Sequence, residues 1–288
     1  MRRQTLVLGA LAHLLIQIVR SGSAHALVPA VRAEEHDLGP AARIPAISAS
    51  LLDRPFRDNA LGEGRGHYDA DPLFRMDAFD CTTYVETVWA LSATPEGGDP
   101  SATLQSLRYR EGQVDFIKRL HFTALDWVPY HQQRGVLRPI DLAPGLPALE
   151  SRTLIDEQAW YQRMHPSQLA RFQQSVPDAR PQLSQLSYFG FRDFIQSPAS
   201  QDVLRDKLKK EALLINFVRP DWDTVRYIGT RIDISHQGFL VLKGDQIFLR
   251  HASAAKGKVV EEDFISYAKA YQSHATLRGF QVFQILGV

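Results

Sequence analysis

The sequence of 288 residues contains a single cysteine, Cys81, and therefore cannot form a disulfide within one chain. Cysteines that support structure in oxidising compartments come in pairs, so Cys81 is either a free thiol or an intermolecular bridge. A free thiol outside the cytosol is open to oxidation, and its presence there needs a reason. The simplest alternative is that Cys81 is a small buried apolar side chain, as cysteine often is.

An excess of charge of either sign is also missing. Residues 1–26 hold three arginines and no acidic residue, so the remainder has 30 Lys and Arg against 32 Asp and Glu. Binding to nucleic acid needs a concentrated basic face, and this near-neutral composition argues against such a partner. Spacings of the C-x-x-C or H-E-x-x-H type are absent, and we expect no metal and no cofactor.

Long apolar runs are missing after the N-terminus, so we expect no stable membrane insertion of the mature chain. At the start, Arg2 and Arg3 precede an apolar run of about fifteen residues, a length typical of the centre of a signal peptide. Residues 24–26, Ala-His-Ala, have the form that signal peptidases cleave. We therefore expect residues 1–26 to be a signal peptide and the protein to be periplasmic or secreted. An uncleaved amphipathic anchor is the alternative.

The remaining chain has the composition of a packed globular protein, because 44% of the residues are hydrophobic and 10% are aromatic. Its first part shows helical spacing, and its last third consists of β-branched and aromatic runs with turn residues between them. This pattern predicts an α+β fold in which an antiparallel sheet packs against a helix. We expect an extended arm at residues 27–60 and one domain at 61–288. An insertion at about 139–181 would hold one helix around 156–172.

The segment Asp77 to Leu91 reads DAFDCTTYVETVWAL, and its apolar residues recur at intervals of three and four, which predicts a helix. If Asp80 is the N-cap, Cys81 is the first helical residue. The free N–H groups and the dipole of a helix start favour negative charge, so we expect them to lower the pKa of the thiol. Asp80 acts in the opposite direction, but less so if its carboxylate turns toward the N–H groups as a cap.

Two histidines lie on either side of a short turn in the last third. His236 is near the start of SHQGFLVL and His251 is near the end of QIFLRHAS, with a two-residue hairpin at Gly244 and Asp245 between these runs. Side chains alternate along a strand, so this register places both histidines on one sheet face as diagonal neighbours. A three-residue turn would put them on opposite faces.

A thiol at a helix start and two histidines on one sheet face fit nucleophilic catalysis. Cys81 would be the nucleophile, His236 the base that takes its proton, and His251 the residue that orients the base. The backbone N–H of Cys81 would stabilise the oxyanion. Two alternatives stay open from the residues alone. In the first, the histidines are core or surface residues whose hydrogen-bonding groups are satisfied and which take no part in catalysis. In the second, all three side chains are ligands of a zinc ion.

These motifs resemble those of a known family. D-C-T at a helix start, S-H-Q-G-F on a strand and H-A-S on the next are similar to motifs of the NlpC-like papain-fold cysteine peptidoglycan hydrolases. FDCTTYVETVWALSA, RYREGQVDFIKRLHF with the Asp126-Trp127 pair, and RIDISHQGF resemble one branch of them, the N-acetylmuramoyl-L-alanine amidase-like branch, formerly a domain of unknown function. The resemblance spans Gly62 to the C-terminus. It implies a papain-like fold, in which the helix that begins at the cysteine packs against the antiparallel sheet that carries the histidines.

The resemblance implies the catalytic roles given above for Cys81, His236 and His251. It also implies a substrate groove. Its residues match the R-L-H and D-W blocks, stand where relatives carry a tyrosine before the cysteine helix, or adjoin a catalytic residue in the sequence: Arg119, His121, Asp126, Trp127, Tyr68, Asp80 and Ser235. Arg119 would pair with a carboxylate of the stem peptide, and Trp127 would stack on a sugar. The alternative for the residues of the two blocks is a structural network beneath the site.

The function implied by the resemblance is hydrolysis of the amide bond between N-acetylmuramic acid and L-Ala of a muropeptide or peptidoglycan fragment, by cysteine nucleophilic catalysis. A γ-D-glutamyl-diamino acid endopeptidase would use the same catalytic residues and is an alternative. A zinc-binding protein or a non-catalytic muropeptide-binding protein is an alternative of another class. The sequence shows no recognisable wall-binding repeat, which favours soluble fragments over intact cell wall as the substrate.

Overall fold

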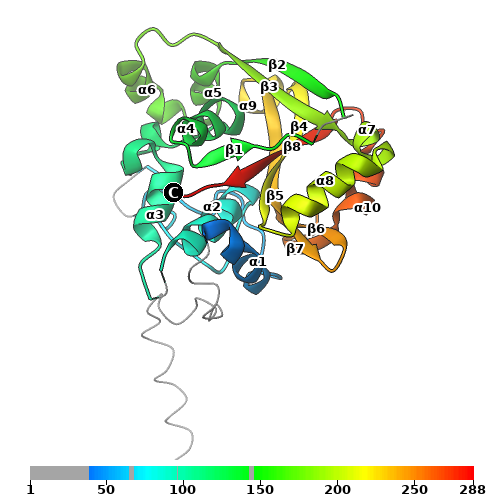
Figure 1. The fold of residues 1–288 in the computed structure, drawn as a ribbon. Helices are drawn as coiled ribbons and strands as arrows, with labels where there is room; N and C mark the ends of the chain where they lie inside the picture. Colours follow the sequence, from blue (N-terminus) through cyan, green and yellow to red (C-terminus); the bar gives the residue numbers. More distant parts are fainter. Residues whose placement is uncertain (1–38, 65–67, 96, 143–145) are drawn as a thin grey trace, which may run out of the picture.

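The computed structural model describes residues 39–64, 68–95, 97–142 and 146–288. At its centre lies an antiparallel sheet in the order β2-β3-β8-β4-β5-β6-β7, with the short β1 paired to β8 (Figure 1). The predicted α+β class with an antiparallel sheet is therefore confirmed. The strands are β1 (Leu137–Pro139), β2 (Ala148–Ile155), β3 (Gln182–Gly190), β4 (Leu213–Trp222), β5 (Ile232–Lys243), β6 (Gln246–Ser253), β7 (Lys258–Asp263) and β8 (Gly279–Ile285).

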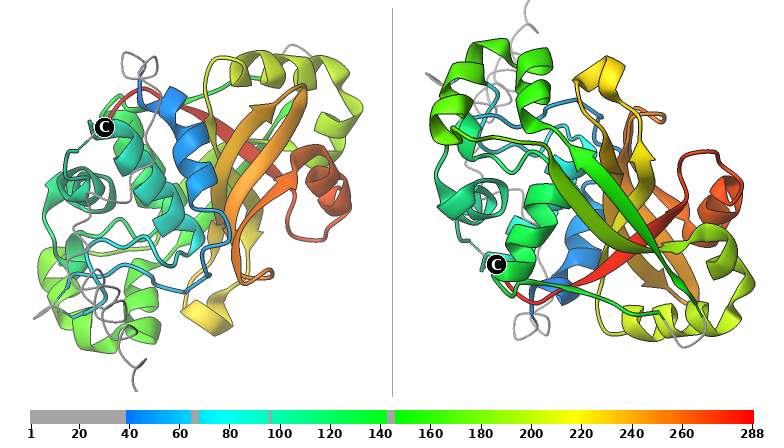
Figure 2. Two further views of the ribbon diagram at one scale, coloured as in Figure 1. Left: turned by 90° about the horizontal axis from the view of Figure 1, so that it is seen from below. Right: turned by 90° about the horizontal axis from the view of Figure 1, so that it is seen from above.

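Helices cover both faces of this sheet, as the two views of Figure 2 show. One face packs against α1 and α2, with α3 packed on α2, and its buried strand residues include Leu214 and Phe239. The other face packs against α7, α8 and α10 through Ile215 and Leu240, because successive residues of a strand point to opposite faces. These helices are α1 (Pro40–Ser50), α2 (Cys81–Ala93), α3 (Ser101–Arg108), α7 (Phe191–Gln196), α8 (Pro198–Leu208) and α10 (Phe264–Tyr271).

Helix α1 lies in the segment that we expected to be an extended arm, residues 27–60. Ala41, Ile44 and Ile47 recur at intervals of three and are buried in the core that α1 shares with α2. Burial of this apolar face stabilises the helix, so the prediction of an extended conformation was wrong for residues 40–50. The predicted signal peptide at residues 1–26 lies outside the described residues.

The middle of the chain, expected as a helical insertion at about 139–181, contributes a strand to the sheet. β2 pairs with β3 along its whole length. The single helix expected around 156–172 is two helices, because a residue before proline disfavours helical conformation and His165 precedes Pro166. The shorter helices are α4 (Val128–Gln133), α5 (Glu157–Met164), α6 (Leu169–Ser175) and α9 (Val225–Ile228), with 3₁₀ helices at Arg110–Gly112, Phe116–Lys118 and Pro166–Gln168 and a π-helix at Thr123–Trp127.

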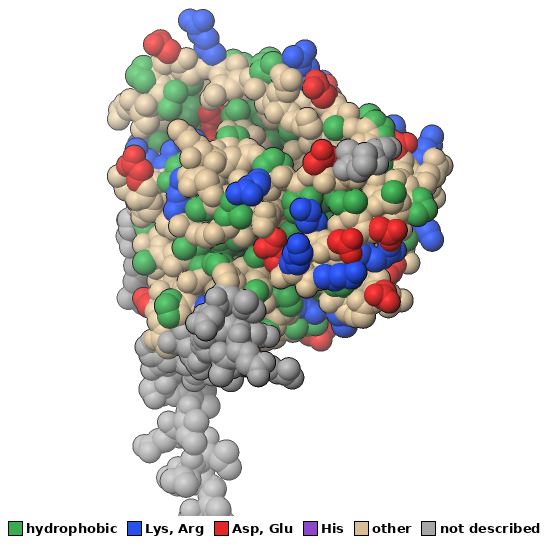
Figure 3. All heavy atoms as spheres, in the orientation of Figure 1, with side chains coloured by type: hydrophobic (Ala, Val, Ile, Leu, Met, Phe, Trp, Pro, Cys, Tyr) green, Lys and Arg blue, Asp and Glu red, His purple; other side chains and the backbone are tan. Residues whose placement is uncertain are grey.

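The surface carries mixed charge. On the face shown in Figure 3, basic and acidic side chains are interspersed, and neither sign forms a large continuous area. This distribution agrees with the near-neutral composition of the sequence. Among the helices of the described ranges, none has the length and apolar character needed to span a bilayer.

Candidate active site

The candidate site is built around the start of α2. The side chain of Asp80 accepts a hydrogen bond from the backbone N–H of Thr83 at 2.8 Å, and the Thr83 hydroxyl accepts one from the N–H of Asp80 at 2.9 Å. This capping box fixes the residue at which the helix begins and confirms the predicted N-cap. The second carboxylate oxygen of Asp80 accepts the N–H of Ala60 at 3.4 Å, so this side chain serves as the cap of α2, and its expected place in the substrate groove stays a prediction.

Cys81, the first residue of α2, is half-buried against β5. The backbone N–H of Gln237, the residue after His236, donates toward the thiol, and the hydroxyl of Thr82 donates to the Gln237 side chain at 2.9 Å. Burial raises the pKa of the thiol to about 12, and the charge of Asp80 adds to the increase. The expected lowering of this pKa was therefore wrong, because loss of solvent outweighs the helix dipole in the free protein.

Strands β5 and β6 form the predicted two-residue hairpin. Lys243 pairs with Gln246, and Gly244 has a φ of 59°, the left-handed value that a type II′ turn needs at this position. In this register His236 and His251 share one face of the sheet, and Nε2 of His236 lies 2.6 Å from Nδ1 of His251. The prediction that the two histidines meet is confirmed.

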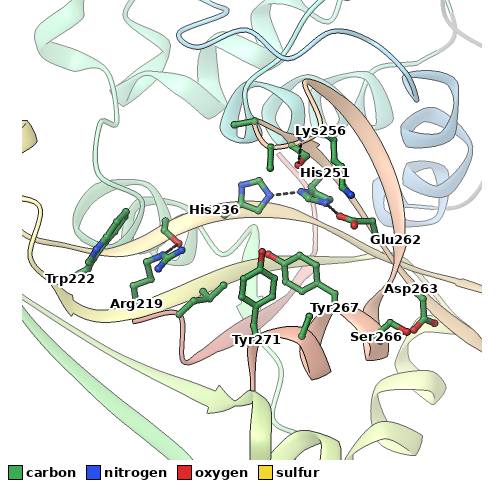
Figure 4. A pocket seen from close by; sticks show the side chains of 16 residues that line it. Arg219, Trp222, His236, His251, Lys256, Glu262, Asp263, Ser266, Tyr267 and Tyr271 are labelled. Atoms are coloured by element: carbon green, nitrogen blue, oxygen red, sulfur yellow. Dashed lines mark hydrogen bonds and ion pairs between the residues drawn. The ribbon is translucent and has the colours of Figure 1, made fainter. Parts of the chain in front are cut away.

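Glu262 on β7 extends the two histidines into a hydrogen-bonded chain (Figure 4). Its Oε2 lies 2.8 Å from Nε2 of His251, and this hydrogen bond holds the pKa of Glu262 below its usual value. An ionised carboxylate only accepts hydrogen bonds, so His251 carries its proton on Nε2, and its Nδ1 accepts the Nε2–H of His236. Neutral His236 then has an unprotonated Nδ1, which is the atom that can act as a base.

His236 is uncharged at neutral pH. Burial lowers its pKa to about 3, and repulsion between a protonated His236 and its neighbours His251 and Arg219 contributes to the decrease. The surroundings are aromatic, with the Phe217 ring 5.6 Å from His236 and the Tyr267 ring 6.1 Å from His251. Thiol and imidazole are thus both neutral, and a proton has to pass between them during any reaction that uses the pair.

The approach of β5 to β6 beside the histidines depends on Gly238. A Cβ at this position would lie 2.7 Å from the carbonyl oxygen of Arg250 and 3.0 Å from the Cβ of His251. Only glycine lets the two strands come this close. On the other edge of β5, the pairing with β4 skips Ser235, directly before His236, and such a bulge changes the direction of the neighbouring side chains.

A cleft of about 1000 Å³ opens beside the two histidines (Figure 4). Arg219 and Trp222 lie at one end of it, and Lys256 and Glu262 at the other. This volume is at the upper end of the range of ligand sites, so the cleft has room for a ligand of several residues. The other lining residues are Ser235, His236, His251, Ser253, Ala254, Ala255, Asp263, Ser266, Tyr267, Ala270, Tyr271 and Leu277.

Comparison with known proteins identifies the family. A family model described as AmiA-like, N-acetylmuramoyl-L-alanine amidase-like, matches residues 46–275. The chain belongs to this AmiA-like family. The predicted resemblance to the amidase-like branch is thereby confirmed, while the wider assignment to the NlpC-like papain fold stays a prediction. A search of curated proteins found no match.

Solved structures share the fold of this AmiA-like chain. A protein from Legionella pneumophila, described by the family name DUF1460, is 29% identical with a TM-score of 0.80, over 91% of this chain and 94% of that one. An N-acetylmuramoyl-L-alanine amidase from Bacteroides uniformis is 21% identical with a TM-score of 0.62, over 84% and 97%. A putative xylanase from Bacteroides fragilis is 21% identical with a TM-score of 0.60, over 83% and 100%. At 21% identity these likenesses concern the fold alone.

Arg119 and Trp127, which we expected in the substrate groove, are structural in this AmiA-like chain. The guanidinium of Arg119 is buried and bonds the carboxylates of Glu63 at 3.0 Å and Asp69 at 2.9 Å. Trp127 is 1% exposed and donates its Nε1–H to Glu86 at 3.1 Å. A sugar cannot stack on a ring that has no exposed face. The expectation for these two residues is therefore corrected to its alternative, a structural network.

The other expected groove residues also lie outside the cleft, apart from Ser235, which lines it together with His236 and His251; Cys81 is not among the lining residues and contacts β5 at the neighbouring residue, Gln237. Asp126 is buried and pairs with Arg110 at 2.8 Å. His121 lines a separate cavity of about 150 Å³, with its Nε2 hydrogen-bonded to a backbone carbonyl. Tyr68 is exposed and packs edge-on against the ring of Phe116. In this conformation these three side chains have no hydrogen bond or ring contact with His236 or His251.

Sequence reasoning missed two residues of the cleft, Glu262 and Arg219. Glu262 lies two residues beyond Val260, which pairs with His251, so strand alternation puts Glu262 on the histidine face. Arg219 lies two residues beyond Phe217, which pairs with His236. The available signal was the alternation of side chains along β4 and β7, but it needs the strand pairing that only the tertiary structure supplies.

The alternative of a zinc site needs a free ring nitrogen from each histidine. Both nitrogens of His251 are already hydrogen-bonded, one to His236 and one to Glu262. Within the part of the chain that the structure describes, no group of three or more His, Cys, Asp or Glu residues is arranged to hold a metal ion. The hydrogen bonds of His251 therefore favour an orienting role over a metal-ligating one.

Proposed function

We propose that this protein is a cysteine-dependent N-acetylmuramoyl-L-alanine amidase with a papain-like catalytic arrangement. The observation that carries the proposal is the chain Glu262–His251–His236, which leaves Nδ1 of His236 as a base on β5, beside the residue whose N–H contacts the thiol. Membership of the AmiA-like family supports the choice of bond. A structural relative from Bacteroides uniformis carries the name of the same activity.

In the proposed reaction, the sulfur of Cys81 attacks the lactyl carbonyl carbon of N-acetylmuramic acid, and the thiol proton passes to Nδ1 of His236. The backbone N–H of Cys81 donates to the oxyanion. The C–N bond then breaks, and His236 gives the proton to the nitrogen of L-Ala, so that the stem peptide leaves as an amine. Water hydrolyses the remaining thioester: His236 takes a proton from the water and returns it to the leaving thiolate.

The electrostatics of the free protein determine when the proton moves. The pKa of the thiol is about 12 and that of His236 about 3, so the proton stays on sulfur until the new C–S bond begins to form. The imidazolium that results donates from Nε2 to His251, which in turn donates to ionised Glu262. The carboxylate at the end of this chain stabilises the positive charge when it appears.

The reaction takes place outside the cytoplasm in this proposal, on soluble muropeptides in the periplasm or the surrounding medium. The support is the basic and apolar start of the chain with its Ala-His-Ala site at residues 24–26. The cleft beside the histidines has room for several residues of such a fragment.

The test is incubation of the protein, from Leu27 onward, with a defined disaccharide-tetrapeptide, followed by product masses. We expect free disaccharide and free tetrapeptide, and loss of both products in Cys81→Ala. Circular dichroism of the variant shows whether it is folded. A disaccharide-dipeptide product would instead assign the endopeptidase activity, and cleavage that survives in folded Cys81→Ala would refute the nucleophile.

A further inference from the structure

Arg219 on β4 lies at one end of the cleft that the two histidines line, beside His236. It is half-buried, and Figure 4 shows its guanidinium among the cleft side chains between Trp222 and His236. Its Nε donates to the hydroxyl of Ser235 at 3.1 Å, and one terminal nitrogen donates to the hydroxyl of Thr276. The Trp222 ring lies 4.6 Å from the guanidinium carbon. Arg219 is thus held in one orientation entirely by neutral groups.

No carboxylate of the described residues forms an ion pair with this guanidinium. Three arginines that are more deeply buried than Arg219 each pair with a glutamate. These pairs are Arg108–Glu86, Arg119–Glu63 and Arg250–Glu261. Partial loss of solvent without a counter-charge lowers the pKa of Arg219. An unpaired cation that is partly removed from water costs stability, and a bound anion would recover that cost.

The second cation of the cleft, Lys256, differs from Arg219. It lies at the opposite end, and its positive charge helps to lower the pKa of Glu262. The ammonium of Lys256 therefore already has an acidic neighbour within the cleft. Arg219 is the cleft cation whose charge has no anion near it among the described side chains, and it has the planar fork that binds a carboxylate with two hydrogen bonds.

The proposed chemistry decides which carboxylate comes to this end of the cleft. His236 protonates the leaving nitrogen of L-Ala, so the stem peptide lies on the side of His236, where Ser235 holds Arg219. The residue after L-Ala is D-Glu, which is joined through its side-chain carboxyl and keeps a free α-carboxylate. Resting on the proposed function, we propose that Arg219, backed by Trp222, binds the α-carboxylate of this D-Glu. The enzyme therefore distinguishes a free carboxylate from an amidated one.

The test compares two small substrates, N-acetylmuramoyl-L-Ala-D-Glu and N-acetylmuramoyl-L-Ala-D-isoglutamine, which differ only in this carboxylate. We expect wild-type protein to favour the free acid by about 10- to 100-fold in kcat/KM, the range of one charge-assisted hydrogen bond or pair of bonds. Arg219→Gln is expected to reduce the preference to about threefold or less, while its rate on the amidated substrate stays within about threefold of wild type. Arg219→Lys, which keeps the charge without the fork, is expected to give an intermediate preference.

A matched control is Arg226→Gln, which removes an exposed arginine that stacks on Tyr227 at 4.4 Å, outside the cleft. It is expected to keep the wild-type preference. The inference is overturned if wild type shows no preference, or if Arg219→Gln keeps it. It is also overturned if Arg219→Gln lowers both rates equally, because that result would mean that Arg219 only supports Ser235 and the strand.

Binding separates failure of this inference from failure of the proposed function. Cys81→Ala is titrated by calorimetry with L-Ala-D-Glu and with L-Ala-D-isoglutamine, which need no hydrolysis. Tighter binding of the free acid, lost in Cys81→Ala combined with Arg219→Gln, supports the carboxylate subsite even if neither muramoyl substrate is cleaved. Equal binding of the two peptides, or binding of neither, overturns it.

Discussion

Replacement of Glu262 by glutamine tests the hydrogen-bonded chain that sets the base. The carboxylate accepts the Nε2–H of His251 at 2.8 Å, and the amide oxygen of glutamine can accept the same hydrogen bond. Glu262→Gln therefore keeps the protonation pattern of both histidines but removes the negative charge. The change should act only where positive charge develops, which is on the imidazolium of His236 during attack by the thiol.

The magnitude follows from the exposure of the carboxylate. A hydrogen bond to a charged group contributes about 1.5–3 kcal/mol. The Glu262 side chain is 32% exposed, so solvent screens part of its charge, and we take the lower part of this range, about 1.5–2 kcal/mol. At about 1.4 kcal/mol per factor of ten, kcat should fall about 10- to 30-fold. KM should change little, because the charge acts on the transition state.

The assay is steady-state kinetics of stem-peptide release by wild type, Glu262→Gln and Glu261→Gln. Glu261 is the neighbouring residue of β7 and accepts from Arg250 at 2.7 Å, so it serves as the control for loss of a carboxylate on this strand. Glu261→Gln should lower stability with kcat within about twofold of wild type. An unchanged kcat in Glu262→Gln, or equal losses in the two variants, would refute the role assigned to the chain.

Three further predictions concern the thiol, the strand contact and the core. The rate of alkylation of Cys81 by iodoacetamide should rise about tenfold per pH unit between pH 7 and 10. The raised pKa keeps the thiolate a minor species over this range, and its fraction increases tenfold with each pH unit. A rate that reaches a plateau below pH 8 would contradict the raised pKa. Gly238→Ala should lower stability by about 1–3 kcal/mol in urea unfolding and abolish most activity, because the new Cβ meets the carbonyl oxygen of Arg250. Wild-type stability of this variant would contradict the close approach of β5 to β6. Trp127→Phe should cost about 1–3 kcal/mol of stability through loss of the hydrogen bond to Glu86, without a change in KM; a raised KM at unchanged stability would return Trp127 to the substrate groove.

Local sequence determined where Cys81 and the two histidines stand on their elements. Asp80 and Thr83, three positions apart, form a capping box, and this short-range interaction sets Cys81 at the start of α2 whatever the helix packs against. The turn at Gly244 and Asp245 sets the hairpin register, and strand alternation then brings His236 to His251. Both features depend on interactions between close neighbours, so the sequence alone predicts them.

Tertiary packing decided the electrostatics of the site and the composition of the cleft. The helix dipole lowers the pKa of the Cys81 thiol and burial raises it, and only the packed structure determines which effect is larger. The residues next to Trp127 in the sequence do not determine whether its ring faces a sugar or the core, and its hydrogen-bond partner Glu86 is 41 residues away. Glu262 and Arg219 lie near the histidines because β7 and β4 pair with the strands that carry them, and residues adjacent in the sequence do not determine this pairing. Charge, burial and cleft lining arise from contacts between distant segments, whereas caps and turns arise from adjacent residues.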